Sequence, residues 1–218
     1  MSVAILPARG GSKRIPRKNV RPFLGRPAIA WPIDAARAVF DRVVVTTDDA
    51  GIAEVARGAG AEVPFLREAG LADDHTGTTE VIADAVGRLD LPADEPVACI
   101  YPTAMLLTTD DLREGLARLD GVTWVLSLGE YRTPIRRAYA REGDRFAAIE
   151  PAAMPMRSQD LAPAYYDAGQ FYLARAGTWR DADARVWDGA AGVVLPETRA
   201  VDVDTPEDWD RAERMARL

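Results

Sequence analysis

The chain has 218 residues, of which 48% are hydrophobic and 28% charged, and its formal net charge at pH 7 is −7. This balance is typical of a folded globular protein and excludes a disordered one. The negative charge argues against a nucleic-acid binder, which needs a broad basic surface, and no apolar run is long enough for a signal peptide or a membrane span. We therefore expect one cytoplasmic domain over residues 1–218 that binds neither nucleic acid nor membrane.

Short apolar runs and amphipathic segments alternate along the first 130 residues. The pattern predicts strands at residues 2–6, 41–47, 95–103 and 121–129, an extended run at 61–66, and helices at 26–39, 50–60, 76–90 and 108–120. Strands that are apolar on both sides indicate a parallel sheet covered by helices on both faces. The predicted fold is therefore a three-layer α/β structure with a mostly parallel sheet.

The alternation stops at residues 131–170, which are rich in Arg, Pro and Met and contain a predicted hairpin turn at residues 142–144. We expect this segment to leave the sheet. The chain is then predicted to return through strands at residues 168–174 and 199–204. It ends in a helix with Thr205 as N-cap, Pro206 in the first turn and Asp208 facing back.

The loop after the first strand carries six basic residues and no acidic residue between Pro7 and Arg21. It also holds the only two lysines of the chain, Lys13 and Lys18, whose ammonium groups are compact point charges where arginine offers a planar fork. Glycines directly after a strand let backbone amides close around phosphate oxygens, although neither a Walker nor a dinucleotide motif is present. The loop predicts a polyphosphate site at the carboxyl end of the first strand, with a solvated loop that binds nothing as the alternative.

A pair of aspartates, Asp202 and Asp204, lies two residues apart on a predicted strand, so that both carboxylates project to the same side. Such a pair suits Mg²⁺ or Mn²⁺, because Mg²⁺ takes one or two carboxylates and leaves its other positions to water and phosphates. The alternative is that the two residues only support the start of the last helix, for which Thr205 is already a sufficient cap.

Several segments together resemble one enzyme family. They are "ILPARGGSKRIPRKN", "VVTTDD", "GAEVPFLR", "CIYPTA", "RSQDL", "DAGQFY" and "DVDTPED", in this order from residue 3 to about residue 212. They resemble the cytidylyltransferases that activate sialic-type sugars, and most of all those specific for pseudaminic acid. The resemblance implies a Rossmann-like nucleotidyltransferase fold with residues 131–170 as a protruding dimerisation arm, and a homodimer.

The activity implied by the resemblance is transfer of CMP from CTP to the anomeric hydroxyl of a nine-carbon acidic sugar, with release of pyrophosphate. Pseudaminic acid is the expected acceptor, and N-acetylneuraminate and legionaminate are the alternatives, because Met105 and Leu173 depart from the family pattern on the sugar side. An alternative of another class is a non-catalytic nucleotide- or RNA-binding module, which would gain nothing from two convergent carboxylates.

The resemblance also implies roles for single residues. Lys18 is expected on the reacting phosphate, with Arg9 and Lys13 as further catalytic residues. The acid sugar is expected near Arg157, Gln159, Gln170 and Tyr172, where an arginine can hold a carboxylate with paired hydrogen bonds. The implied nucleotide site consists of Ala8, Arg9, Gly10, Gly11, Ser12, Lys13, Arg14, Lys18, Asn19, Arg67 and Thr78.

Overall fold

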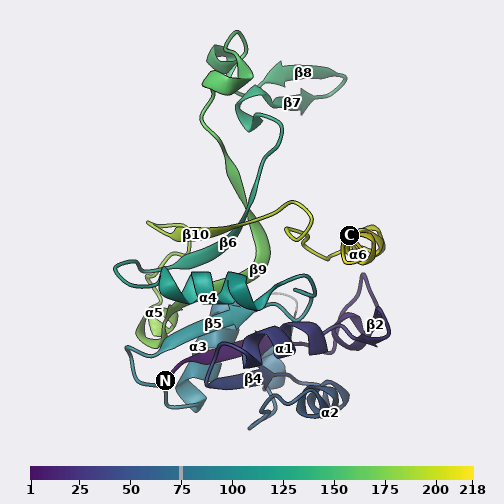
Figure 1. The fold of residues 1–218 in the computed structure, drawn as a ribbon, viewed down its shortest axis with the longest axis vertical. Helices are drawn as coiled ribbons and strands as arrows, with labels where there is room; N and C mark the ends of the chain where they lie inside the picture. Colours follow the sequence, from purple (N-terminus) through teal and green to yellow (C-terminus); the bar gives the residue numbers. More distant parts are fainter. Residues whose placement is uncertain (74–75) are drawn as a thin grey trace.

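A six-stranded sheet forms the centre of the molecule in the computed structural model, which describes residues 1–73 and 76–218 (Figure 1). Strand β9 runs antiparallel to both of its neighbours, and the other strands run parallel to one another. The predicted mostly parallel sheet is therefore confirmed. From edge to edge the strands are β10 (Ala191–Leu195), β6 (Val125–Glu130), β9 (Tyr165–Arg175), β5 (Pro96–Ile100), β1 (Val3–Pro7) and β4 (Arg42–Thr46).

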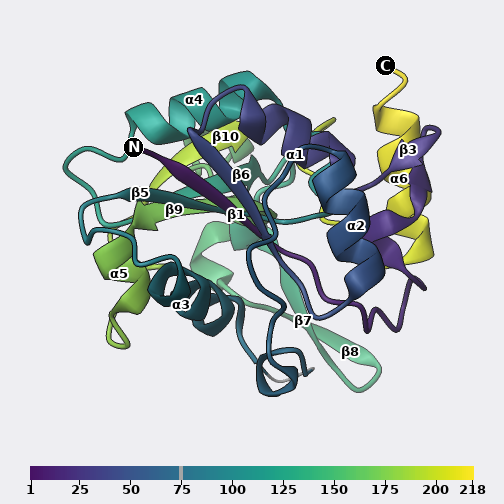
Figure 2. The same ribbon diagram turned by 90° about the horizontal axis from the view of Figure 1, so that it is seen from below.

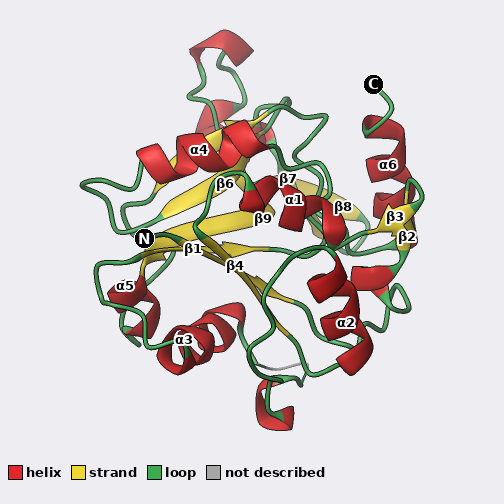
Figure 3. Cartoon of the chain, turned by 60° about the horizontal axis from the view of Figure 1, so that its bottom comes forward, coloured by secondary structure: helices red, strands yellow, loops and turns green. Residues whose placement is uncertain are grey.

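Helices cover both faces of this sheet, as predicted. Ala4 and Leu6 of β1 point into a core shared with α1 (Ala30–Arg37), α2 (Ala50–Gly58) and α4 (Thr109–Ala117). The alternate residues Val3 and Ile5 point into a second core with α3 (Thr78–Arg88) and α5 (Ala176–Arg180). Figures 2 and 3 show α1 and α4 on one side of the sheet and α3 and α5 on the other, which gives three layers.

A third and smaller apolar cluster joins the basic loop to the last helix, α6 (Pro206–Met215). Helix α6 starts as predicted, because the Thr205 hydroxyl accepts a hydrogen bond from the Asp208 amide and the Asp208 carboxylate accepts one from the Thr205 amide. Residues 201–204 lie between the loop and this helix. The buried side chains of the cluster are Ile15, Phe23, Ala28, Met105, Val201, Val203, Trp209 and Ala212.

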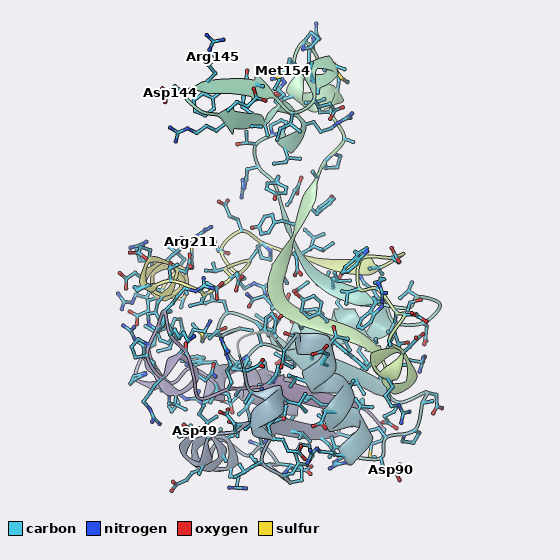
Figure 4. All side chains as sticks on the ribbon, turned by 180° about the vertical axis from the view of Figure 1, so that it is seen from behind. Asp49, Asp90, Asp144, Arg145, Met154 and Arg211 are labelled. Atoms are coloured by element: carbon cyan, nitrogen blue, oxygen red, sulfur yellow. The ribbon has the colours of Figure 1, made fainter. Side chains whose placement is uncertain are left out.

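An arm leaves the sheet between β6 and β9 and carries a hairpin of β7 (Tyr139–Glu142) and β8 (Arg145–Ala148) (Figure 1). The hairpin turn lies at the predicted place, with Gly143 at a φ of 64°. Figure 4 shows Asp144, Arg145 and Met154 at the far end of the arm. Tyr139, Phe146 and Ile149 are exposed there. The arm thus presents apolar side chains away from the body of the molecule.

Short elements complete the chain. The strands β2 (Pro22–Phe23) and β3 (Arg26–Pro27) form a small hairpin. The short 3-10 helices are η1 (Lys18–Val20), η2 (Ala69–Leu71), η3 (Ile135–Arg137), η4 (Pro151–Ala153) and η5 (Ser158–Asp160).

Within the described ranges no helix combines the length and the apolar character that crossing a membrane requires.

Three predictions about these elements are wrong. The first helix starts at Ala30 instead of residue 26, because residues 26–27 pair in the β2–β3 hairpin. The predicted extended run at 61–66 lies beside β4 and the residue after it, joined by two isolated bridges and by the ion pair of Arg42 with Glu62. The arm ends before Tyr165, where β9 already pairs with β6.

The third error concerns the predicted strand at residues 199–204, because these residues belong to no strand. The edge strand is instead β10, which sequence patterning missed because its burial is interrupted and only one neighbour, β6, pairs with it. Residues 201–204 are nevertheless alternately buried and open: Val201 and Val203 are buried, whereas Asp202 is exposed and Asp204 about half exposed. Both carboxylates therefore project to one side, as predicted.

Candidate active site

A cleft of about 720 Å³ opens at the carboxyl ends of β1 and β5. The residues that follow these two strands line it, together with residues from the loop before α3 and from the segment before α6. This is where the sequence predicts a ligand. The predicted site residues that line the cleft are Arg9, Ser12, Lys13, Arg14, Lys18, Asn19, Arg67, Thr78, Asp202 and Asp204.

The basic loop is shaped by hydrogen bonds between its backbone and side chains from outside the turn. The Gly10 amide donates to Asp48 Oδ1 at 2.9 Å, and the Asn19 side-chain amide donates to the Arg9 carbonyl at 2.9 Å. A Cβ on Gly10 would lie 3.0 Å from the Asp49 carboxylate, so that only glycine fits without displacement there. Ala8 is fully buried and, like Gly10 and Gly11, does not line the cleft. The contact of these three residues with a nucleotide stays a prediction.

Lys18 lies against the acidic segment. Its Nζ is 2.8 Å from the Val203 carbonyl oxygen and 3.3 Å from Asp204 Oδ1, and only 21% of its side chain is exposed. Arg14 Nη1 is 3.2 Å from the other oxygen of Asp204. Asp204 is therefore held between two cations, and the Lys18 ammonium is fixed at the junction of the basic loop and the carboxylates.

Asp202 has no comparable ion pair among the described residues, and its environment disfavours its charge. Burial of one side of the carboxylate, followed by the like charge of Asp204, raises its pKa, while Lys18 acts in the opposite direction. The backbone of Gly169 lies close to this carboxylate, since a Cβ on residue 169 would lie 3.1 Å from Asp202 Cγ. A cation placed between Asp202 and Asp204 would relieve the repulsion between them.

Arg67 places a buried positive charge in the cleft wall. The residue is 7% exposed, and its guanidinium donates to the Thr46 carbonyl at 2.5 Å and to the Thr46 hydroxyl at 3.3 Å. Burial lowers its pKa, and the nearby carboxylates of Asp48 and Asp84 counteract this. Since arginine stays protonated in proteins, the cleft keeps this charge at all physiological pH values.

Two tyrosines connect the cleft to an acidic residue that sequence reasoning missed. The hydroxyls of Thr78 and Tyr101 are 3.2 Å apart, and the Tyr101 and Tyr172 rings meet edge to face with centroids 5.8 Å apart. The Tyr172 hydroxyl donates to Asp167 Oδ2 at 2.5 Å. Burial raises the pKa of both tyrosines. Tyr101 lines the cleft, whereas Tyr172 does not.

The signal for Tyr101 and Asp167 was present in the sequence. Both residues lie in segments that carry the family resemblance, "CIYPTA" and "DAGQFY", although the roles implied above include neither. Their proximity depends on the pairing of β5 with β9, which patterning along the chain does not reveal.

The remaining predicted sugar-site residues do not line this cleft. Gln170 is 1% exposed, and its side-chain amide donates to the carbonyls of Ala168 and Val201. Arg157 and Gln159 lie at η5 on the arm. The contact of these residues with a sugar stays a prediction.

Comparison with known proteins agrees with this geometry. A family model described as cytidylyltransferase matches residues 3–122. A pseudaminic acid cytidylyltransferase from Campylobacter jejuni subsp. jejuni serotype O:2 is 37% identical, over 100% of this chain and 97% of its own length. This chain belongs to the cytidylyltransferase family. A CMP-N,N'-diacetyllegionaminic acid synthase from Legionella pneumophila is 29% identical over 99% of this chain and 96% of its own length.

The fold of this cytidylyltransferase is also that of solved structures. A CMP:2-keto-3-deoxy-manno-octonic acid synthetase complexed with CTP superposes with a TM-score of 0.69. The superposition covers 99% of this chain and 98% of the other, at 17% sequence identity. The nucleotidyltransferase fold expected from the resemblance is confirmed.

The half-buried pair of Tyr101 and Tyr172 predicts a loss of stability at high pH. Tyrosine in an unfolded chain ionises near pH 10, whereas the raised pKa keeps Tyr172 protonated in the folded state. The contribution of Tyr172 to the free energy of unfolding is therefore fully present below about pH 10 and decreases as the pH rises further. We expect Tyr172→Phe to reduce the loss of unfolding free energy between pH 8 and pH 11, measured by urea titration.

Tyr165→Phe is the matched control, because Tyr165 is 45% exposed at the start of β9, outside the proposed dimer contact. This variant should lose as much stability between the two pH values as the parent. An equal loss in Tyr172→Phe would contradict the prediction.

Proposed function

We propose that this cytidylyltransferase transfers CMP from CTP to the anomeric hydroxyl of pseudaminic acid and releases pyrophosphate. The observation that carries the proposal is the placement of Lys18 of the basic loop beside Asp204 in one cleft. The acceptor is supported by the relative from Campylobacter jejuni, which is more similar than the legionaminic acid enzyme. Because CTP is a cytoplasmic metabolite, we also propose a cytoplasmic site of action.

N-acetylneuraminate and legionaminate remain the alternative acceptors, since enzymes for both occur among the relatives. The relatives give no support to a non-catalytic nucleotide- or RNA-binding module.

The residues of the cleft divide the work of nucleotidyl transfer, which consists mainly of positioning and charge neutralisation. We assign the outer phosphates to Lys13, Arg9 and Arg14 and the cytidine side to Arg67 and Thr78. Lys18 would contact the α-phosphate, where negative charge develops as the sugar hydroxyl attacks. Its ammonium is already oriented by the Val203 carbonyl, so that little reorganisation is needed at the moment of reaction.

We propose that Asp202 and Asp204 hold Mg²⁺ or Mn²⁺. The donor set fits, because two carboxylates on one side of the segment face the cleft, and a cation would relieve the repulsion between them. In the part of the chain that the structure describes, no three Asp, Glu, His or Cys side chains gather as a metal site. The remaining ligands would come from CTP oxygens and water, as Mg²⁺ prefers. When bound, the ion would neutralise phosphate charge.

We also propose a homodimer formed through the arm. The exposed apolar side chains of Tyr139, Phe146 and Ile149 would be covered by a second copy. In this proposed dimer, Arg157 and Gln159 of each arm would lie at the cleft of the other copy.

The activity is tested by incubating the enzyme with CTP, Mg²⁺ and each of the three candidate sugars. We expect pyrophosphate release and a CMP-sugar detected by mass spectrometry, with the highest kcat/KM for pseudaminic acid. ATP and GTP should be poor donors, and EDTA should stop the reaction. Preference for another sugar would reassign the acceptor, and no turnover with any of them would refute the proposal.

Lys18→Arg tests the role of the ammonium group. This variant keeps the charge but replaces a point donor with a wide planar fork, and loss of one transition-state contact typically costs on the order of 100-fold in kcat. We expect kcat to fall by about this factor and the KM for CTP to change much less.

Arg118→Lys is the control for an exchange between arginine and lysine away from the cleft. Arg118 pairs with Glu114 on the exposed face at the end of α4. Its kinetics should match the parent. If Lys18→Arg also turned over like the parent, the loop would act through its arginines and backbone amides alone.

The dimer is tested by light scattering at micromolar concentration. The measured mass should be twice the 23.7 kDa of the chain, and Phe146→Asp should lower it towards the monomer because it places a charge in the apolar contact. Arg145→Asp, which changes an exposed polar position next to Phe146 whose side chain points to the opposite face of the hairpin, should leave the mass unchanged. A monomeric parent protein would rule out the proposed assembly.

A further inference from the structure

We propose that Gln170 is a positioning residue that holds the segment of Asp202 and Asp204 in place, in contrast to the sugar contact that the family resemblance implies. This inference rests on the proposed role of the two aspartates in holding a cation. It starts from the way in which residues 200–204 are supported.

Residues 200–204 belong to no strand, and side chains bind three of their carbonyls where a neighbouring strand would normally do so. The Ala200 carbonyl accepts from the Tyr166 hydroxyl at 3.5 Å. The Val201 carbonyl accepts from Gln170 Nε2 at 2.8 Å, and the Val203 carbonyl accepts from Lys18 Nζ at 2.8 Å. Gln170 thus makes the short contact directly before Asp202.

The environment of Gln170 suits this role and leaves little room for a ligand. Its Nε2 also donates to the Ala168 carbonyl at 3.1 Å. Two carbonyl oxygens face the same atom, and only a side chain that donates two hydrogens can satisfy both. With 1% of its surface exposed, Gln170 offers almost nothing for a sugar to contact.

A bulge in β9 aims Gln170 at the acidic segment. Leu126 of β6 pairs with Tyr172 and Leu128 pairs with Asp167, so that Ser127 alone lies opposite residues 168–171. Ser127 is fully buried, and its Oγ accepts the amides of Gln170 and Phe171, both at 3.1 Å. Bulges of this kind redirect side chains beside active sites.

The same bulge also comes close to the carboxylate of Asp202. Gly169 has a φ of 61°, a region that glycine adopts at no steric cost, and a Cβ on it would lie 3.1 Å from Asp202 Cγ. The bulge therefore holds the backbone before Asp202 through Gln170, and it leaves room for the Asp202 side chain because residue 169 is glycine.

The test uses Gln170→Met, which has a similar volume but no donor. In the absence of metal, hydrogen exchange measured by mass spectrometry should become faster in peptides covering residues 200–204. In turnover with CTP and pseudaminic acid, the Mg²⁺ concentration at half-maximal rate should rise about tenfold or more, as for loss of a residue behind a metal ligand. The KM for the sugar should stay within about twofold of the parent, since such a residue acts through the ligand and not on the sugar.

Trp179→Phe is the matched control, because it also removes a buried N–H that donates to a backbone carbonyl, that of Val97 at 3.1 Å, on the opposite face of the sheet. It should change neither exchange at residues 200–204 nor the Mg²⁺ dependence. Ser127→Ala is a second variant on the same bulge and should show the same changes in exchange and in Mg²⁺ dependence as Gln170→Met. It keeps the test possible if Gln170→Met fails to fold.

A raised KM for the sugar, with exchange and Mg²⁺ dependence as in the parent, would overturn the proposal in favour of direct sugar contact. Asp202→Asn separates this result from a failure of the proposed metal role. If Asp202→Asn kept normal turnover, the metal role would be wrong, whereas exchange at residues 200–204 in Gln170→Met would still decide whether Gln170 holds the segment.

Discussion

The cleft depends on the small apolar cluster that ties the basic loop to α6. Trp209 lies at its centre, almost fully buried, with its ring edge to face with that of Phe23 at a centroid distance of 5.8 Å. Val201 and Val203 point into the same cluster and alternate with the two aspartates, so burial of the valines forces the carboxylates outward. Loss of a buried tryptophan typically costs about 3–5 kcal/mol, so this contact is a large part of what holds the cleft together.

Charge then organises what packing has brought together. Lys18 and Arg14 contact the two oxygens of Asp204, so the acidic segment and the basic loop attract each other without any ligand. Such partly exposed pairs contribute little to stability, and their main effect here is on geometry. The carboxylate of Asp202 is still repelled by that of Asp204, so a cation bound between them would lower the electrostatic energy of the site.

Local signals in the sequence predicted the parts of the fold that local interactions determine. Thr205 and Asp208 cap α6 as their spacing indicated, and the hairpin turn lies at Gly143 as expected. The antiparallel direction of β9 and the edge strand β10 depend on pairing between distant residues. For the same reason the contact of Tyr172 with Asp167 and the bulge opposite Ser127 could not be read from the order of residues.

The candidate site shows a related limit on what a family resemblance can transfer. The motif "DAGQFY" placed Gln170 and Tyr172 near the reaction centre, but a motif does not say which atoms a side chain faces. Gln170 faces two carbonyl oxygens inside the protein, and Tyr172 faces a carboxylate, so both reach the cleft only through other residues. Lys18, by contrast, lines the cleft itself and also supports the backbone of the acidic segment. Burial and hydrogen-bond partners therefore distinguish residues that support this cleft from residues that can touch a ligand in it.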